Sequence, residues 1–198
     1  MYKDLINKKV LVTGSSSGIG LEIAKDFSKA GSIIALNGRD KSKLKKAVKN
    51  IYGSKMIHGN VEDPKIAKKI VTKAVSLLNG LDILVCNVGS GKSVKSGLEN
   101  YQDWQSSFKK NFFSTTNIIE ASKKYLVRSR GNIICISSIC GVEYIPGAPI
   151  TYSVAKSALN SYVKMTAKIL GQKGVRINAI APGNILFKGS VWEKKIKK

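Results

Sequence analysis

The sequence predicts an α/β protein with a Rossmann-like, doubly wound parallel sheet that carries helices on both faces. Three observations support this fold class. Short apolar runs alternate along the chain with amphipathic helical stretches, a glycine-rich turn joins the first apolar run to the first helix, and polar residues follow the ends of several runs. Such alternation is typical of parallel strands joined by helical crossovers, and ligands then bind at the carboxyl ends of the strands.

Six strands are expected, each as an apolar run bounded by turn residues. They cover residues 9–13, 33–36, 55–58, 82–86, 131–136 and 174–180, with helices between them. The clearest helix covers residues 63–78, where one side carries Ile66, Ile70, Val71, Ala74, Val75 and Leu78 and the other carries lysines. His58, the only histidine, is expected to end the third strand rather than to bind a metal or act in catalysis. No metal site is predicted.

The chain suits a single domain over residues 1–198, because its length and its 43% hydrophobic content allow a sizeable core. The Gly/Ser stretch over residues 89–97 is interpreted as an active-site loop rather than a domain boundary. Residues 1–9 lack an apolar signal core, and no apolar run approaches the roughly 18 residues of a membrane span. Cys86, Cys135 and Cys140 are expected to be reduced thiols. A cytoplasmic protein without membrane contact is therefore expected.

The net charge of +22 raises one alternative from another class, a nucleic-acid-binding protein with a basic surface. Nearly all of the excess is lysine, and the arginines are only Arg39, Arg128, Arg130 and Arg176. The lysines are spread over the predicted helices and do not alternate with aromatic residues along one stripe. Nucleic acid is therefore the weaker choice of partner.

The first motif that carries chemistry is the turn over residues 10–20, Val-Leu-Val-Thr-Gly-Ser-Ser-Ser-Gly-Ile-Gly. An apolar strand stops at Gly14, and an amphipathic helix follows Gly20. Glycines allow unusual dihedral angles and a close approach of phosphate to the backbone, while the free amides of a helix N-terminus attract negative charge. The turn predicts a dinucleotide site.

The second motif is the pair Tyr152 and Lys156, which a helix places on one face. The pKa of free tyrosine is about 10, so a phenol that acts as an acid or a base near neutrality needs a nearby positive charge. In many helices with this spacing the tyrosine packs and the lysine is solvated. The pair alone therefore does not indicate a catalytic site, and the other motifs of the chain are needed to interpret it.

Together these motifs resemble those of the short-chain dehydrogenase/reductase family, over roughly residues 8–187. Residues 81–89 are similar to the family's Asn-Asn-Ala-Gly strand end, with Cys86 and Val88 as departures. Trp104 and Asn111 match the helix with the active-site Asn, residues 131–138 match the strand with the catalytic Ser, and residues 176–183 match the Pro-Gly turn beside the nicotinamide. In general appearance the chain is most similar to the 3-oxoacyl-carrier-protein reductase branch.

The resemblance implies hydride transfer between a nicotinamide and a carbonyl carbon. Tyr152 would exchange a proton with the carbonyl oxygen, and Lys156 would lower its pKa and hold the nicotinamide ribose. Ser138 would hydrogen-bond the same oxygen, and Asn111 would hold a water in a proton relay. Ser137 is the rival of Ser138, but strand alternation and the spacing to Gly141 favour Ser138. The implied catalytic residues are Asn111, Ser138, Tyr152 and Lys156.

The resemblance also implies NADP(H) rather than NAD(H). Gly38 occupies the place of the Asp of NAD-preferring members, and Arg39 follows it. Against this, Arg39 could be a solvated turn residue, Asp40 partly offsets its charge, and Ser17 replaces the Arg or Lys of many NADP-dependent relatives. The implied cofactor contacts are Gly14, Ser16, Ser17, Gly18, Ile19, Gly20, Arg39, Asn60, Val61, Asn87, Gly89, Tyr152, Lys156, Pro182, Gly183 and Ile185.

The C-terminal part departs from the family pattern. Phe187 stands where the family has a Thr that binds the nicotinamide carboxamide, and Ser190 is the nearby candidate to replace it. Most relatives continue well beyond Lys198, so the last strand and the substrate lid are expected to be missing and the domain to be incomplete at this end. An inactive cofactor-binding remnant is thus an alternative to an enzyme. The expected partners are a small-molecule or carrier-bound carbonyl substrate and a second copy, docked through the helices that carry Asn111 and Tyr152.

Overall fold

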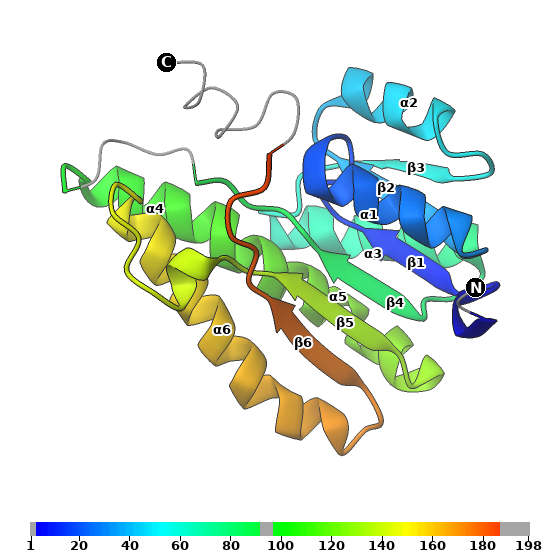
Figure 1. Ribbon diagram of the computed structural model, residues 1–198. Helices are drawn as coiled ribbons and strands as arrows, with labels where there is room; N and C mark the ends of the chain where they lie inside the picture. The colour runs from blue at the N-terminus through cyan, green and yellow to red at the C-terminus, as the bar shows by residue number, and fades with distance from the viewer. Residues whose placement is uncertain (1–2, 92–96, 187–198) are drawn as a thin grey trace.

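The computed structural model describes residues 3–91 and 97–186 of the chain. Its centre is a six-stranded parallel sheet with the order β3-β2-β1-β4-β5-β6 (Figure 1). The prediction of six strands in a parallel sheet is confirmed. The strands are β1 (Lys9–Val12), β2 (Ile33–Gly38), β3 (Lys55–His58), β4 (Ile83–Cys86), β5 (Asn132–Ile136) and β6 (Arg176–Ile180).

The order of the strands reverses beside β1, which pairs with β2 on one side and with β4 on the other. In open α/β sheets a crevice forms at such a point, outside the carboxyl ends of the strands. β2 runs two residues further than expected, because Asn37 and Gly38 pair with Ile57 and His58 of β3. His58 ends β3, as predicted, and its ring lies 3.0 Å from the Arg39 carbonyl oxygen.

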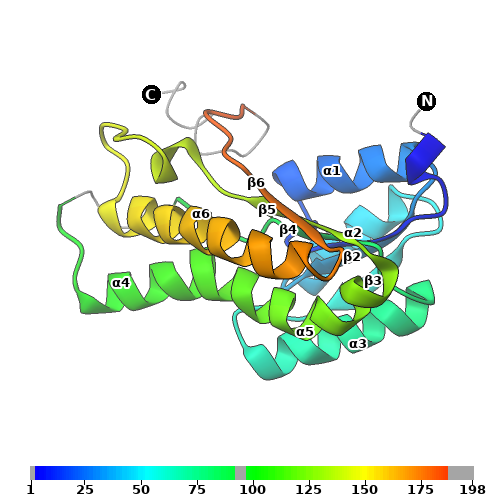
Figure 2. The same cartoon turned by 90° about the horizontal axis from the view of Figure 1, so that it is seen from below.

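Helices lie on both faces of the sheet (Figure 2). α1 and α2 cover one face, and α3, α5 and α6 pack on the other. A π-helical segment, η2, joins α4 to α5, and η1 and η3 are short 3-10 turns. No described helix is long and apolar enough to cross a membrane. The bounds are η1 (Lys3–Leu5), α1 (Gly18–Lys29), α2 (Lys41–Lys49), α3 (Pro64–Leu78), α4 (Tyr101–Phe108), η2 (Lys109–Phe113), α5 (Ser114–Ser129), η3 (Ile139–Gly141) and α6 (Ile150–Gly171).

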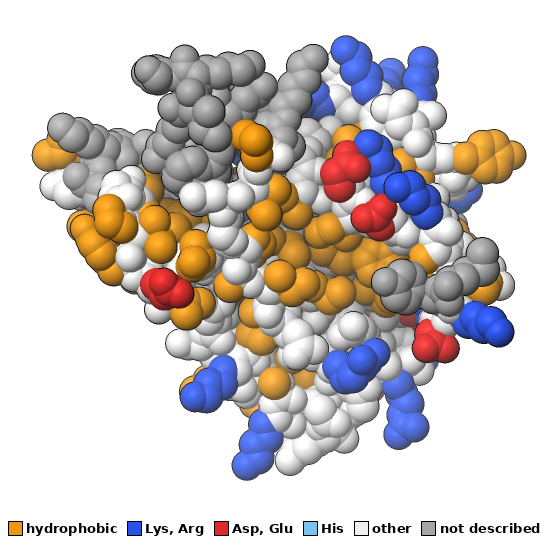
Figure 3. Space-filling model, viewed as in Figure 1, with side chains coloured by type: hydrophobic (Ala, Val, Ile, Leu, Met, Phe, Trp, Pro, Cys, Tyr) orange, Lys and Arg blue, Asp and Glu red, His pale blue; other side chains and the backbone are white. Residues whose placement is uncertain are grey.

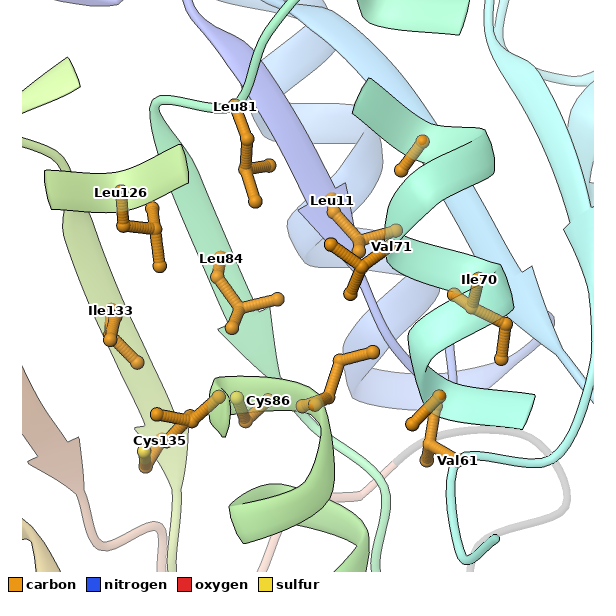
Figure 4. Close-up of a cluster of buried hydrophobic side chains, with 14 of the residues drawn as sticks. Leu11, Val61, Ile70, Val71, Leu81, Leu84, Cys86, Leu126, Ile133 and Cys135 are labelled. Carbon is orange, nitrogen blue, oxygen red and sulfur yellow. The ribbon is translucent and has the colours of Figure 1, made fainter. Parts of the chain in front are cut away.

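The hydrophobic core has two layers, because alternate residues of each strand point to opposite faces. Leu11, Leu84 and Ile133 of neighbouring strands point toward α3 and α5 (Figure 4). Val10 and Val12 belong to the layer under α1 and α2. Strands buried on both faces read as continuous apolar runs, which is why the sequence shows them clearly.

The helix expected over residues 63–78 is α3, and it begins after Asp63, whose Oδ1 accepts the amides of Lys65 and Ile66 at 2.7 and 3.0 Å. Ala67, Ile70, Val71, Ala74 and Leu78 form its buried stripe. Ile66 differs from the expectation, since it is 36% exposed. It lies in the first turn of α3 and packs against Gly59 at the rim of the core.

The two faces of the sheet are covered unequally. Among the described residues, α1 packs on β1 and β2, and α2 packs on β2 and β3. The same face of β4, β5 and β6 lies open toward the viewer in Figure 1, and Figure 3 shows hydrophobic side chains gathered at the middle of this view. β6 is the edge strand of the described sheet, with Ile180 53% exposed. The expected lack of a further strand and a lid concerns chain beyond the described residues.

Candidate active site

A pocket of about 1120 Å³ lies across the carboxyl ends of the strands. One end is lined by Arg39 and Glu62, and the other by Tyr152 and the apolar loop over residues 145–149. The predicted site residues that line it are Gly14, Ser16, Ser17, Gly18, Ile19, Arg39, Asn60, Val61, Asn87, Gly89, Ser138, Tyr152, Lys156, Pro182, Gly183 and Ile185. Gly20 and Asn111, also predicted, do not line the pocket and lie behind its wall.

The glycine-rich turn approaches β4 too closely for larger residues. Gly14 has a φ of +63°, which side-chain-bearing residues rarely adopt. A Cβ at Gly20 would lie 2.4 Å from Asn87 Nδ2, which itself donates to the carbonyl oxygens of Thr13 and Gly14 at 3.2 and 3.1 Å. Gly20 and Asn87 therefore fix the shape of the turn, and Asn87 also lines the pocket.

The N-terminus of α1 opens into the same pocket. Ser17 is its N-cap residue, yet its side chain makes no capping hydrogen bond, and the first turn of α1 holds no acidic residue. Amides at a helix start carry partial positive charge and have no acceptor inside the helix. The turn is thus suited to bind a phosphate, in keeping with the dinucleotide site that its sequence motif predicts.

The pocket's outer end carries a charged pair that the sequence does not predict. Arg39 Nη1 lies 3.4 Å from Glu62 Oε1, with the arginine side chain 66% exposed and the glutamate side chain 11% exposed. Asp40, expected to offset Arg39, instead caps α2 by accepting the Lys43 amide at 2.9 Å. Glu62 is the carboxylate that pairs with Arg39, and the pairing of β2 with β3 brings it there.

Asn60 and Val61 line the pocket next to Glu62. The Asn60 side-chain oxygen accepts the Glu62 amide at 3.1 Å, and Asn117 Nδ2 donates to the carbonyl oxygens of Val61 and Glu62 at 3.3 and 3.2 Å. These bonds hold the segment after β3 in place. The oxygen expected to face an adenine amino group is therefore already shared with the backbone, although an amide oxygen can accept two bonds.

The opposite end of the pocket gathers hydroxyl, phenol and ammonium groups. Ser138 follows β5 and is buried, and its Oγ accepts the Cys140 amide at 3.2 Å. The Oγ of its neighbour Ser137 is buried without a hydrogen-bond partner among the described residues. Lys156 Nζ donates to the Ile136 carbonyl oxygen at 2.8 Å and lies 6.0 Å from the centre of the Tyr152 ring.

Burial dominates the electrostatics at this end. Burial raises the pKa of Tyr152, a hydrogen bond with Ser138 lowers it in part, and the Cys140 thiol raises it further. Burial also lowers the pKa of Lys156 to about 8, against the opposing effect of the Cys135 and Cys86 thiols. The expected lowering of the tyrosine pKa by Lys156 is therefore not found. The physical reason is that the ammonium is bound to the Ile136 carbonyl, while the phenol is withdrawn from water.

Asn111 lies in η2 and is 1% exposed. Its Oδ1 accepts the Ser90 amide at 2.8 Å, and its Nδ2 donates to the Ser90 carbonyl oxygen and to Ser107 Oγ, both at 3.3 Å. A Cβ at Gly89 would lie 3.1 Å from both Asn111 Oδ1 and Lys156 Nζ. Asn111 thus approaches the lysine from behind Gly89, and its role in a proton relay stays a prediction.

The segment after β6 closes the pocket from a third side. The Ile139 amide donates to the Pro182 carbonyl oxygen at 3.0 Å, which ties this segment to η3. Gly183 and Ile185 line the pocket beyond it. Phe187 and Ser190, discussed for the carboxamide contact, lie outside the described residues. The three cysteines are free thiols, with Cys86 and Cys135 buried in the core, as expected.

The fold and the site define a class of protein: a Rossmann-type nucleotide-binding protein with a tyrosine and a lysine at the carboxyl ends of its strands. The profile of the family described as short chain dehydrogenase matches residues 8–195. The chain belongs to the short-chain dehydrogenase/reductase family.

Individual relatives agree with this assignment. The chain is 34% identical to the 3-oxoacyl-[acyl-carrier-protein] reductase of Aquifex aeolicus, over 91% of this chain and 75% of the relative. It is 31% identical to the glucose 1-dehydrogenase of Gluconobacter oxydans, over 93% of this chain and 72% of the relative. A short-chain dehydrogenase/reductase of unknown function from Caenorhabditis elegans, solved with cofactor, superimposes with a TM-score of 0.90 at 25% identity, over 98% of this chain and 77% of that one.

Proposed function

We propose that the protein is an NADP(H)-dependent oxidoreductase that interconverts a carbonyl compound and a secondary alcohol. One observation carries the proposal: a single pocket joins the glycine-rich turn and Arg39 to Ser138, Tyr152 and Lys156. The names of the relatives, a reductase and a dehydrogenase, support the same reaction class. The nicotinamide would supply or accept the hydride.

The cofactor would lie along the whole pocket. The turn amides and the start of α1 would hold its phosphates, Arg39 its 2′-phosphate, and Asn60 with Val61 its adenine. The Pro182–Gly183 turn and Ile185 would border the nicotinamide, and Lys156 would hold the nearby ribose. Gly38 supports the choice of NADP(H), because a side chain there would meet Ser16, with a Cβ 3.2 Å from Ser16 Cβ. An Asp, which would repel the 2′-phosphate, has little room.

The proton would pass through Tyr152. Because burial raises its pKa, Tyr152 holds its proton at neutral pH and suits the role of an acid that protonates the developing alkoxide. Ser138 would donate a hydrogen bond to the same oxygen as negative charge grows on it. The Lys156 ammonium, with a pKa of about 8, stays charged at neutral pH and would donate hydrogen bonds to the ribose hydroxyls of the cofactor. Asn111 would support the lysine through Gly89 and Ser90.

The test is direct. The chain is incubated with NADPH, or with NADH, and a panel of 3-oxoacyl esters, sugars and simple ketones, and the loss of nicotinamide absorbance is followed. We expect turnover with NADPH that disappears in Tyr152→Phe. Binding of NADPH without turnover of any compound would instead favour an inactive cofactor-binding protein. If neither nucleotide binds, the proposal is wrong.

Carrier-bound acyl groups are one substrate class within the proposal. The apolar loop over residues 145–149 lines the pocket beside Tyr152, and the net charge of +22 suits an acidic carrier. Faster turnover of a carrier-bound acyl substrate than of the free thioester is the expected result. Equal rates would argue against a carrier. The free thiols suit a reducing compartment, and we propose the cytoplasm.

A homodimer through the helices that carry Asn111 and Tyr152 is the proposed assembly. Large apolar side chains are exposed on these helices: Phe113 (48%), Met165 (65%) and Ile169 (60%). Met165 and Ile169 are four residues apart and so lie on one face of α6, where a contiguous apolar patch would suit an interface. Light scattering during gel filtration is expected to show a dimer that Met165→Glu converts to a monomer. A monomeric wild type would refute this assembly.

A further inference from the structure

The first turn of α6, which carries Tyr152, lacks a capping side chain from its own sequence. Pro149 occupies the N-cap position, and no side chain there bonds the helix amides. The first amides of a helix have no acceptor within it and must find one elsewhere. The acceptor comes from 51 residues earlier in the chain, where Glu99 Oε1 accepts the Ile150 amide at 2.6 Å.

The Glu99 carboxylate binds several amides at once. Its Oε2 accepts the Gly97 amide at 2.8 Å, and the Thr151 amide also bonds the carboxylate. Burial raises the pKa of Glu99, but the bonds from its own amide and those of Ile150, Gly97 and Thr151 outweigh burial and lower the pKa overall. A negative charge at this place also opposes the positive end of the helix dipole. The carboxylate therefore ties the segment before α4 to the start of α6.

Tyr152 lies within the turn that Glu99 holds, because α6 begins at Ile150. We propose that Glu99 is a positioning residue for Tyr152: by fixing the first turn of α6, it keeps the Tyr152 hydroxyl beside Ser138 in the pocket. Glu99 is not among the residues that line the pocket, so it acts through the helix and touches neither substrate nor cofactor. Lys156 has its own anchor on the Ile136 carbonyl oxygen. The inference rests on the proposed role of Tyr152.

The experiment compares two caps. Glu99→Ala removes the cap of α6, and Asp63→Ala removes the cap of α3, whose carboxylate likewise accepts two amides of a first turn. α3 carries none of the proposed catalytic residues, so Asp63→Ala controls for the loss of a helix cap as such. A third variant, Glu99→Gln, keeps an oxygen that can accept the Ile150 amide. The full chain is used in each case.

Two readouts separate positioning from stability. The first is the titration of the Tyr152 phenol by NMR of ring-labelled tyrosine, with the signal assigned by its loss in Tyr152→Phe. The second is kcat at saturating cofactor. In Glu99→Ala we expect the Tyr152 pKa to fall toward its ordinary value, because burial raises it in the wild type, and kcat to fall about tenfold, which the loss of one cap can produce. Cofactor affinity should change less than about twofold, because Glu99 lies outside the pocket and distant sites affect each other only weakly.

Asp63→Ala should lose thermal stability to a similar degree but keep the Tyr152 titration and kcat, and Glu99→Gln should lie between wild type and Glu99→Ala. The proposal is wrong if Glu99→Ala leaves the Tyr152 titration unchanged, or if Asp63→Ala alters it equally. If the wild type turns over no carbonyl compound, the proposed function fails, and the titration alone still decides whether Glu99 positions Tyr152.

Discussion

The two ends of the pocket are built on opposite physical principles. At the outer end, backbone amides and a partly exposed ion pair between Arg39 and Glu62 would provide the proposed recognition of the cofactor. At the inner end, Lys156 is only 2% exposed and Ser138 only 7%. Exposed charges are screened by water and salt and contribute little each, whereas buried charges interact strongly but are costly to desolvate. Changes at the outer end should thus tune affinity by small steps, and changes at the inner end should switch activity and alter stability.

The largest effect is expected for Tyr152→Phe. Loss of the phenol hydroxyl removes the proposed acid while its ring still fills the site, so turnover should fall about a thousandfold. Nucleotide affinity, set mainly at the outer end, should stay within about twofold. Steady-state kinetics and a fluorescence titration with NADPH measure the two quantities. A variant that keeps a tenth or more of the activity would remove Tyr152 from the mechanism.

Lys156→Met should abolish turnover and yet stabilise the fold. The shift of the lysine pKa from 10.5 to about 8 corresponds to a burial cost of roughly 3 kcal/mol. The lost hydrogen bond to Ile136 offsets about 1 kcal/mol, which leaves a gain in unfolding free energy of about 2 kcal/mol at pH 7. Chemical denaturation measures this gain in unfolding free energy. Lys164→Met, at an exposed position on the same helix, is the control.

The pH dependence of that gain follows from the direction of the shift. Between pH 8 and 10.5 the unfolded wild type still binds a proton that the folded protein has released. Its stability therefore rises with pH through this range. The advantage of Lys156→Met should be constant below about pH 8 and shrink above it. A difference that does not depend on pH would mean that the lysine is not desolvated.

Arg39→Ala tests the outer end. Loss of the guanidinium should weaken NADPH binding about tenfold, the effect of one charge-assisted contact, and leave NADH binding unchanged. Fluorescence titrations with both nucleotides at two salt concentrations measure this effect. Arg128→Ala, an exposed arginine in the last turn of α5, is the matched control for net charge. Equal weakening by both variants would show that Arg39 acts only through the overall charge.

The smallest effect is expected for Glu62→Gln. Removing the carboxylate frees Arg39 from its partner, so NADPH should bind about threefold more tightly, in keeping with the small energies of exposed pairs. In the Arg39→Ala background the same substitution should have no effect, which a double-mutant cycle tests. Glu22→Gln, which breaks the exposed pair with Lys25, controls for charge. A gain that persists without Arg39 would contradict the interpretation of the pair.

Prediction from the sequence succeeded where the signal was local. The central strands β1, β2 and β4 are buried along most of their length, so their apolar runs stand out, and the family motifs placed Ser138, Tyr152 and Lys156 in one pocket. It failed where partners are chosen by tertiary structure. Asp40 is next to Arg39 in sequence but caps α2, and Glu62 reaches Arg39 only through the strand pairing.

The pKa shifts at the inner end of the pocket also could not be predicted from the sequence alone. Tyr152 and Lys156 are neighbours on a helix, which suggested that the ammonium lowers the tyrosine pKa. The dominant influence is burial, together with the bond from Lys156 to Ile136, and neither can be read from spacing along one helix. The role of Glu99 is likewise not predictable from the sequence, because its partner Ile150 is 51 residues away. Glu99 reaches Ile150 only because α4 packs against α6.

The π-helical segment η2 makes the length of its helix as important as its composition. A π-helical turn closes a longer ring than an α-helical one, so one residue more is accommodated where Asn111 lies. Deleting a single residue here would favour one uninterrupted α-helix from α4 through α5. The residues before the deletion would then be rotated by about 100° relative to those after it. A deletion that makes the helix more regular would thus rotate Asn111 and Ser107 relative to each other and break the contacts with Ser90. Insertions and deletions should therefore be tolerated far less in η2 than substitutions on its outer surface.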